Sequence, residues 1–308
     1  MPLLGHVLLV NPTITSRRSA RFPLAALNLA AALDGRYGWT ILDGNVDRDF
    51  ISTALRRLQA GGVDALGVSV MGGPQLRTAI ALSQAVRARF AHIPIIWGGQ
   101  FPTICAAACL EEPFVDYAVR GQGEETFIEL LDALRGAHLD ALPDIPGLSW
   151  RAGDRIVHNC NRPFSAAGLL RELPFERLGN PQRYLGRTFL GQRTSGYQAA
   201  LGCRFRCTFC GVAAMFRGRT ALPPAQRLDQ DLRYLRDELG ADSIQFYDHN
   251  FFDREEDTLP LLEVLAKFQL PWWCFARSSR SGAGSAVRPR NIAATPQKVQ
   301  RNRHPSAA

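Results

Sequence analysis

The strongest constraint on the fold is a regular alternation of strand-like and helix-like segments over residues 1–136. Short apolar runs that end in turn residues alternate, five times in succession, with longer segments of helical apolar spacing. The expected strands are 6–12, 38–45, 64–73, 93–103 and 114–124, and the expected helices are 22–36, 47–62, 74–90, 104–112 and 124–136. Successive βα units predict an α/β fold with a doubly wound parallel sheet. Ligands of such sheets bind at the carboxyl ends of the strands.

The rest of the chain divides into three stretches. Residues 137–195 contain an expected β-hairpin, with its turn at 152–154, and then a linker with scattered prolines. A second α/β pattern covers residues 196–277. Its strands are expected at 197–202, 242–251 and 271–277, and its helices at 223–240 and 254–269. Residues 278–308 hold almost no large apolar side chain, so we expect a disordered basic tail.

The net charge of +8 is not spread over a folded surface. Residues 278–308 carry six Arg and Lys side chains and no acid, which leaves +2 for the other residues, and we predict no specific nucleic-acid site. No apolar run of about 18 residues is present, so no transmembrane helix is expected. The first residues lack the cationic segment of a signal peptide. These features predict a cytoplasmic protein with reduced cysteines.

Three of the seven cysteines lie within one short stretch, at Cys203, Cys207 and Cys210. A disulfide would leave one of these thiols over. A structural zinc site normally takes four ligands, and the candidates for a fourth, such as His249 and Cys274, do not stand at a finger-like spacing. A four-iron cluster fits better, because three thiolates leave one iron open to a small molecule.

The C-x3-C-x2-C spacing, the aromatic Phe209 before the last cysteine and the position after a strand resemble the radical S-adenosylmethionine (SAM) enzymes. The resemblance implies a partial βα barrel whose three cysteines hold a 4Fe-4S cluster, at which SAM is bound and reductively cleaved. It implies that Phe209 lies near the adenine of SAM. Asp248 and Asn250, in "FYDHNFF", resemble a D-x-N-F variant of the segment that contacts the SAM amino group. The alternative is that these two residues only precede a helix.

Four amino-terminal segments, "RFPLAALNLAAAL", "GVSVMGGP", "WGGQFPT" and "VRGQGEETF", resemble the Rossmann-like cobalamin-binding domain that is fused to some radical SAM barrels. The resemblance implies cobalamin contacts at Ser69, Gly98, Gly99, Gly121 and Gly123. The Asp-x-His-x-x-Gly motif, which supplies a histidine to cobalt in other cobalamin proteins, is absent. Cobalamin therefore either binds without a protein histidine or does not bind. Glycines at strand ends also serve simply as turn residues.

Together the two resemblances cover residues 5–277 and imply an enzyme. They imply SAM cleavage coupled to cobalamin-dependent methyl transfer, or to radical oxidation or cyclisation, of an unknown small organic substrate, with an external electron donor such as a flavodoxin or ferredoxin. A radical SAM core has more βα units than the three found here, so we expect a chain truncated or frameshifted near residue 277. The alternative function is a non-catalytic cobalamin- or metal-binding remnant.

The four other cysteines are expected to be structural. Cys105 and Cys109 lie one helical turn apart in the apolar segment "ICAAACL", where buried thiols are a better interpretation than metal ligands. The same interpretation applies to Cys160 and Cys274. The expected cluster ligands are therefore confined to the loop at residues 203–210.

Overall fold

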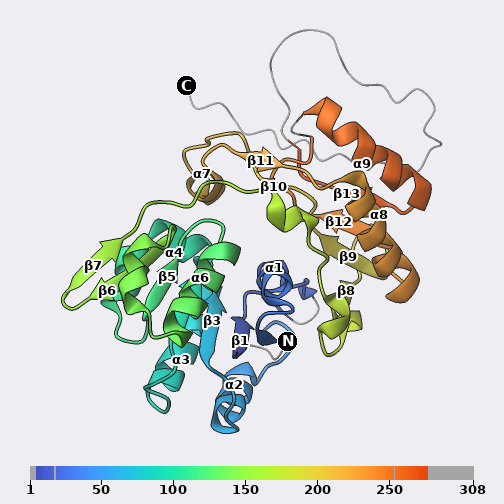
Figure 1. Cartoon of the computed structure of the whole chain (residues 1–308). Helices are drawn as coiled ribbons and strands as arrows, with labels where there is room; N and C mark the ends of the chain where they lie inside the picture. Colours follow the sequence, from blue (N-terminus) through green and yellow to red (C-terminus); the bar gives the residue numbers. More distant parts are fainter. Residues whose placement is uncertain (1–4, 17–18, 253, 277–308) are drawn as a thin grey trace.

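The computed structural model describes residues 5–16, 19–252 and 254–276, and the tail that the sequence predicts to be disordered lies outside these ranges. Two β-sheets and a two-stranded ribbon organise the described residues (Figure 1). The strands are β1 His6–Asn11, β2 Gly38–Asp43, β3 Ala65–Ser69, β4 Ile95–Gly98, β5 Tyr117–Val119, β6 Leu148–Ala152, β7 Arg155–His158, β8 Leu185–Gly186, β9 Thr194–Tyr197, β10 Leu201–Gly202, β11 Thr220–Ala221, β12 Ser243–Phe246 and β13 Trp272–Trp273.

Nine α-helices lie among the described residues. They are α1 Leu24–Leu33, α2 Phe50–Gln59, α3 Pro74–Arg87, α4 Gln100–Ile104, α5 Ala106–Glu111, α6 Glu124–Arg135, α7 Gly211–Phe216, α8 Ala225–Arg233 and α9 Glu255–Phe268. Shorter 3-10 turns span Leu139–Asp144, Ala167–Leu170, Phe175–Arg177 and Pro181–Tyr184, and a π-helical turn spans Tyr234–Glu238. Helix α3 begins at Pro74, as predicted, because proline suits the first turn, where no helical hydrogen bond needs its amide.

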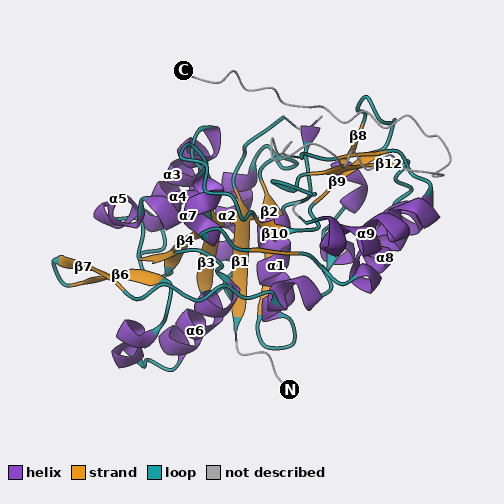
Figure 2. Ribbon diagram, turned by 90° about the horizontal axis from the view of Figure 1, so that it is seen from above, coloured by secondary structure: helices purple, strands orange, loops and turns teal. Residues whose placement is uncertain are grey.

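The amino-terminal sheet confirms the parallel arrangement that the alternating pattern predicts. Its strand order is β2-β1-β3-β4-β5-β6-β7, and the first five strands are parallel (Figure 2). The predicted hairpin is also present, and it turns at Gly153, whose φ is +60°. Its first strand, β6, pairs antiparallel with β5. The sheet therefore extends past residue 136, while the domain boundaries themselves stay predictions.

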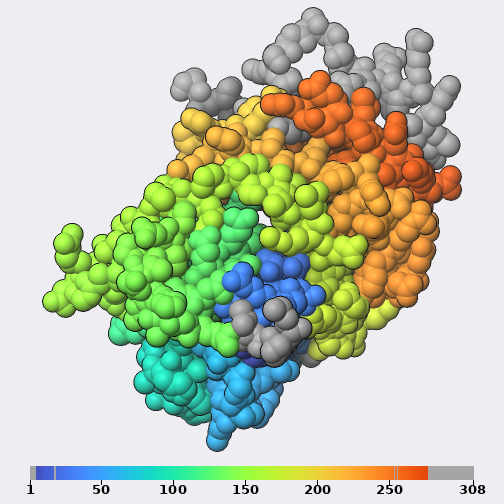
Figure 3. Space-filling view, in the orientation of Figure 1, coloured from blue at the N-terminus to red at the C-terminus, as the bar shows by residue number. Residues whose placement is uncertain are grey.

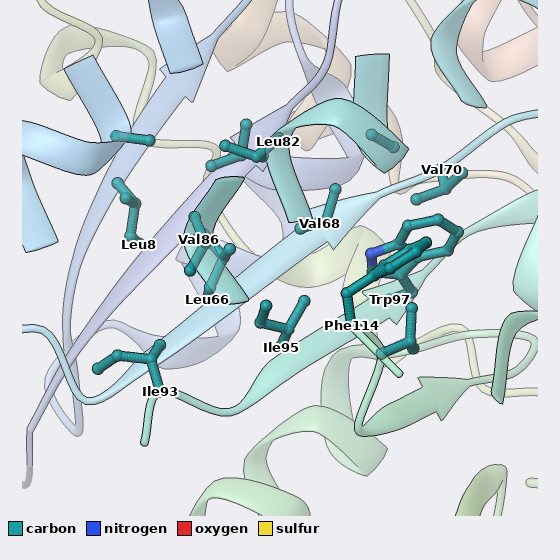
Figure 4. Close-up of a cluster of buried hydrophobic side chains, with 14 of the residues drawn as sticks. Leu8, Leu66, Val68, Val70, Leu82, Val86, Ile93, Ile95, Trp97 and Phe114 are labelled. Atoms are coloured by element: carbon teal, nitrogen blue, oxygen red, sulfur yellow. The ribbon is translucent and has the colours of Figure 1, made fainter. Parts of the chain in front are cut away.

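Helices cover both faces of this sheet. Apolar side chains of α2, α3 and α5 pack on one face, and those of α1 and α6 pack on the other. Figure 4 shows the first of these cores, in which Leu66 and Val68 of β3 lie beside Ile95 and Trp97 of β4. The indole N–H of Trp97 donates to Oγ of Ser83 at 2.9 Å, so its polar atom is satisfied inside the core. Each such buried large side chain stabilises the fold by about 2 kcal/mol.

Helix α4 lies where the sequence predicts only a strand and a glycine-rich loop. It begins at Gln100, directly after Gly99, whose φ of +100° lets the chain turn sharply away from β4. Pro102 lies in its first turn, where a missing amide proton costs no helical hydrogen bond. The side chain of Gln100 therefore stands at the carboxyl edge of the sheet, close to the predicted ligand loops.

The second sheet is mixed and has the order β13-β12-β9-β8, with β8 antiparallel to β9 and the other pairs parallel. The strand predicted at 197–202 was misplaced. The strand that pairs with β12 ends at Tyr197, and residues 201–202 pair instead with Thr220–Ala221. The sequence of β9, Thr-Ser-Gly-Tyr, has no apolar run, yet all four residues are buried beneath neighbouring elements. Apolar periodicity cannot detect a strand of this kind.

An aromatic junction joins the two sheets. Phe22, which precedes α1, packs against Phe175 and Tyr184 of the linker with ring centroids 4.9 Å and 4.8 Å away. Phe175 in turn stacks on Tyr234 at 5.6 Å. Figure 3 shows the linker residues, in yellow-green, arching between the two parts of the molecule.

Within the described ranges, no helix combines the length and the apolar character needed to cross a membrane.

Candidate functional site

The carboxyl edge of the amino-terminal sheet brings four of the predicted cobalamin residues together. Ser69 and Gly98 are register partners at the ends of β3 and β4. Thr103 joins the loops that follow, because its hydroxyl donates to the carbonyl of Gly99 at 2.6 Å and accepts the N–H of Gly121 at 2.9 Å. Thr103 was not singled out from the sequence, although it lies in the quoted segment "WGGQFPT". It holds the β4 and β5 loops in fixed relative positions.

The glycines of this edge differ in their conformation and in the space around them. Gly99 has a φ of +100°, and an added Cβ would lie 3.0 Å from the carbonyl oxygen of Val70. Gly121 has a φ of +72°, whereas Gly123, which precedes α6, has an ordinary φ of −95°. At Gly73, no described atom lies within 4 Å of an added Cβ. Glycine backbone allows a ligand to approach closely, so these residues are compatible with cobalamin, and their contacts with it stay predictions.

A buried polar network around Gln75 connects the loop that follows β3 to the end of β1. The side chain of Gln75 accepts the N–H of Met71 at 2.7 Å and donates to Oδ1 of Asn11 at 2.9 Å and to the carbonyl of Pro12 at 3.0 Å. Asn11 donates to Oδ1 of Asp43 at 2.9 Å. Burial raises the pKa of Asp43, and the hydrogen bonds that its carboxylate accepts act in the opposite direction. Sequence reasoning missed Gln75, because a glutamine in the first turn of a helix carries no distinctive signal.

Cys203, Cys207 and Cys210 lie on one loop, between β10 and α7, and each is half-buried. The N–H of Cys210 donates to the carbonyl of Cys207 at 3.1 Å, which closes a turn between them. Phe209 is 81% exposed. In the part of the chain that the structure describes, no three His, Cys, Asp or Glu side chains gather closely enough to hold a metal ion. The three thiols therefore share one loop but are not gathered around a common point. Their residue type suits an iron–sulfur cluster, and the ligand roles and that of Phe209 stay predictions.

The end of the cysteine loop packs against the cobalamin-type edge of the first sheet. Helix α7 contacts α4, and a Cβ added at Gly211 would lie 2.3 Å from Nε2 of Gln100. The carbonyl oxygen of Met215 lies 3.9 Å from the position of an added Cβ at Gly121. Because Gly211 has no side chain, the side chain of Gln100 can lie directly against its backbone, next to Cys210. Two candidate cofactor sites, far apart in sequence, meet at this contact.

Asp248 is fully buried at the end of β12 and is hydrogen-bonded to the segment that leads to the cysteine loop. Its carboxylate accepts the N–H groups of Ala199, at 3.2 Å, and Ala200. Burial raises the pKa of Asp248 to about 6, although the two amides act in the opposite direction. Asn250 is buried nearby in sequence, at 5% exposure. Asp248 thus ties β12 to the β9–β10 connection, and the SAM contacts of both residues stay predictions.

Comparison with known proteins identifies the amino-terminal part. The family model described as the B12 binding domain matches residues 11–131. The chain contains a B12-binding domain. Cytidylyl-2-hydroxyethylphosphonate methyltransferase of Streptomyces wedmorensis is 24% identical over an alignment of 318 positions, which takes in 86% of this chain and 59% of that protein. Anaerobic magnesium-protoporphyrin IX monomethyl ester cyclase of Synechocystis sp. is 26% identical over 259 positions, or 80% of this chain and 50% of that protein.

A solved structure shows the same fold over most of the chain. The radical S-adenosylmethionine methyltransferase TsrM of Kitasatospora setae, solved with cobalamin and a 4Fe-4S cluster, superposes with a TM-score of 0.69 at 20% identity, over 89% of this chain and 54% of TsrM. This B12-binding-domain protein is therefore related to cobalamin-dependent radical SAM enzymes. It spans about half the length of the curated relatives that it matches.

The buried carboxyl of Asp248 makes a specific pH dependence testable in this B12-binding-domain protein. Since its folded pKa of about 6 lies above the ordinary value of 3.8 for an aspartate, the folded state holds this proton more tightly than the unfolded state. Its stabilising contribution is present below the unfolded pKa and is lost as the pH rises through the folded pKa. Relative to Asp248→Asn, we expect the wild type to lose about 2 kcal/mol of unfolding free energy between about pH 4 and about pH 7.

Urea unfolding of both proteins at about pH 4 and about pH 7 measures this difference, and subtraction of the variant cancels the other titrating groups. A wild-type-to-variant difference that does not change with pH would show that Asp248 is not responsible.

The cysteines outside the loop at residues 203–210 meet the sequence-based expectation in part. Cys109 and Cys274 are buried, at 2% and 5% exposure, and burial raises the pKa of each thiol to about 12. Cys105 is half-buried. The prediction for Cys160 was wrong, because this thiol is exposed beyond the end of the β6–β7 hairpin. Its exposure makes it a useful control for thiol chemistry.

Proposed function

We propose that the chain binds cobalamin at the carboxyl edge of its first sheet and a 4Fe-4S cluster through Cys203, Cys207 and Cys210. In this proposal the second sheet is the first part of a radical SAM barrel. The enzyme would cleave SAM reductively and couple this to methyl transfer, or to radical oxidation or cyclisation, of a small organic substrate. When bound, the cluster supplies electron transfer to SAM, and cobalamin supplies a methyl carrier.

The observation that carries this proposal is the packing of α7 on α4. The close approach of Gln100 to Gly211 sets the end of the cysteine loop beside the helix that starts from Gly98 and Gly99. Thr103 links the same helix to Gly121. The same group of contacts therefore adjoins both candidate cofactor sites, as expected of a protein that uses the two cofactors together.

The residues of the chain have separate roles in this proposal. The three thiolates would hold the cluster, and Phe209 and the end of β12, with Asp248 and Asn250, would bind SAM. The glycine backbone at Ser69, Gly98, Gly99, Gly121 and Gly123 would receive cobalamin. We also propose a cytoplasmic location and a flavodoxin or ferredoxin as electron donor.

Anaerobic reconstitution tests the proposal. The full chain is incubated with ferrous iron and sulfide, desalted, and then assayed with SAM and dithionite for 5′-deoxyadenosine, while hydroxocobalamin retention is followed by absorbance. We expect a brown protein that retains cobalamin and forms 5′-deoxyadenosine. A protein that retains cobalamin but no iron, and that forms no 5′-deoxyadenosine, would instead indicate the non-catalytic alternative.

A further inference from the structure

Residues 162–168 of the linker, here called the strap, lie against the glycine loop at residues 121–123. The side chain of Gln122 makes two hydrogen bonds with the backbone of Ser165. Its Nε2 donates to the Ser165 carbonyl at 2.6 Å, and its Oε1 accepts the Ser165 N–H at 2.8 Å. A side-chain amide offers a donor and an acceptor together, so it satisfies both backbone groups of one residue. Gln122 therefore holds the middle of the strap in one position on the glycine loop.

A second anchor holds the start of the strap on α6. Nε of Arg162 donates to Oγ1 of Thr126 at 2.8 Å. The guanidinium also pairs with Glu125 at 3.3 Å and with Glu129. The Arg162 side chain is only 12% exposed, so these charged hydrogen bonds are partly shielded from water. Only two residues separate this anchor from the one that Gln122 provides.

Phe164 lies between the two anchors and reaches the helix that follows the cysteine loop. Its ring packs edge-on against that of Phe216 in α7, with the ring centroids 6.3 Å apart. Phe216 in turn lies over the base of the cysteine loop, because a Cβ added at Gly202 would lie 2.9 Å from its Cγ. Gly202 directly precedes Cys203. A continuous series of contacts therefore runs from Gln122, through the strap, to the cysteine loop.

Helix α7 needs such support from its neighbours. It has six residues, and a helix of that length is not stable without tertiary contacts. The residue that follows it, Arg217, lies near Arg120, which precedes the glycine loop. Burial, and after it the like charge of Arg217, lowers the pKa of Arg120. The two guanidinium groups repel each other, so the contact between Phe164 and Phe216 holds α7 near the glycine loop against this repulsion.

We propose that Gln122 is a positioning residue, which fixes the cysteine loop relative to the glycine loop by clamping the strap that carries Phe164. The consequence of this role rests on the proposed function, because these two loops are the candidate sites of the cluster and of cobalamin. The contacts themselves need no cofactor. The tests therefore use the reduced full chain without cofactors, so that a failure here is separate from a failure of the proposed function.

The first test is Gln122→Ala, which removes both hydrogen bonds to Ser165. We expect amide hydrogen exchange in the strap to rise at least about tenfold, and alkylation of Cys203 by iodoacetamide to rise at least about threefold. Peptide mass spectrometry measures both rates. Faster exchange in the strap with unchanged alkylation of Cys203 would show that the strap does not position the cysteine loop.

Gln59→Ala is the matched control for this variant. Gln59 is exposed at the end of α2, and α2 packs on the face of the sheet opposite to α6. Both rates are expected to equal those of the wild type. A control that raised both rates as much as Gln122→Ala would overturn the proposal.

Gln122→Glu provides a rescue that general destabilisation does not produce. Its carboxylate accepts the Ser165 N–H but cannot donate to the carbonyl, whereas the protonated carboxyl does both. We expect the variant to behave like Gln122→Ala at about pH 8 and like the wild type at about pH 4. Each exchange rate is divided by the wild-type rate at the same pH. A ratio that stays constant between these pH values would contradict the proposed role.

Gln122→Ala also serves as the reference for this pH comparison, since its own ratio to the wild type is expected not to change. Subtracting its behaviour removes the titration of the charged side chains around the clamp, which are Glu124, Glu125, Arg162 and Arg171.

Phe164→Ala separates the two steps of the connection. It removes the ring that contacts Phe216 and leaves both anchors of the strap in place. We expect alkylation of Cys203 to rise as in Gln122→Ala, while the amide of Ser165 keeps its wild-type protection. If alkylation of Cys203 stayed at the wild-type rate, the connection through Phe216 would be wrong.

A measurement on the wild type alone covers the case in which a variant does not fold. Hydrogen exchange is followed at rising urea concentrations below the unfolding transition. The amides of the strap and of residues 202–216 are expected to exchange through one shared opening, with the same free energy and the same dependence on urea. Separate openings of the two segments would overturn the proposal.

Discussion

Replacing Cys207 with alanine is expected to abolish cluster assembly and leave the B12-binding domain folded. Cys207 is the middle of the three cysteines, and the turn that it forms with Cys210 is a backbone hydrogen bond, which alanine preserves. Because a four-iron cluster that already lacks a fourth protein thiolate would keep only two, we expect reconstituted iron to fall from about four atoms per chain to below about one. The variant should also form no 5′-deoxyadenosine.

The control for this experiment is Cys160→Ala. Cys160 is exposed and lies outside the loop, so its removal tests whether iron binds adventitiously to any accessible thiol. Iron and sulfide analysis after desalting, with far-ultraviolet circular dichroism for the fold, measures both variants. If Cys207→Ala retained the wild-type iron content, or if Cys160→Ala lost as much, the three-cysteine assignment would be incorrect.

Sequence patterns predict the five parallel strands of the amino-terminal sheet well, because these strands are short apolar runs bounded by turn residues. Strand β3, with four of its five residues buried, is an example, and Pro74 marks the start of the next helix. The parallel order then follows from the βα alternation. Apolar patterns do not predict strand β9, because its sequence Thr-Ser-Gly-Tyr has no apolar period. Its residues are buried only because other elements pack against them.

The candidate site also has a part that the sequence predicts and a part that it does not. The residue types of the cysteine loop and of the glycine loops can be read from the chain, because their spacing is local. The contact between Gln100 and Gly211 cannot, because it depends on how two distant helices meet. The same holds for the bonds from Ala199 and Ala200 to Asp248. These contacts supply geometry on which the proposed function rests.

Gly202→Ala is expected to be the most disruptive single-methyl change near the cysteine loop. Gly202 precedes Cys203 and has a φ of +76°, a region that costs a residue with a Cβ about 1–2 kcal/mol. An added Cβ would also lie 2.3 Å from the carbonyl oxygen of Arg219 and 3.0 Å from Cβ of Phe216. The first of these atoms is backbone and cannot rotate away, so overpacking adds about 1–3 kcal/mol.

Relief of this clash requires β10 and β11 to separate, because Gly202 pairs with Thr220, the residue after Arg219. Separation would displace the base of the cysteine loop, so we expect both a lower thermal midpoint and a loss of most reconstituted iron. Gly179→Ala is the matched control, since its added Cβ meets no described atom within 4 Å and its φ lies outside the positive region. It should leave iron content unchanged and alter stability by less than about 1 kcal/mol. A Gly202→Ala protein with wild-type midpoint and iron content would show that the loop does not depend on this ribbon.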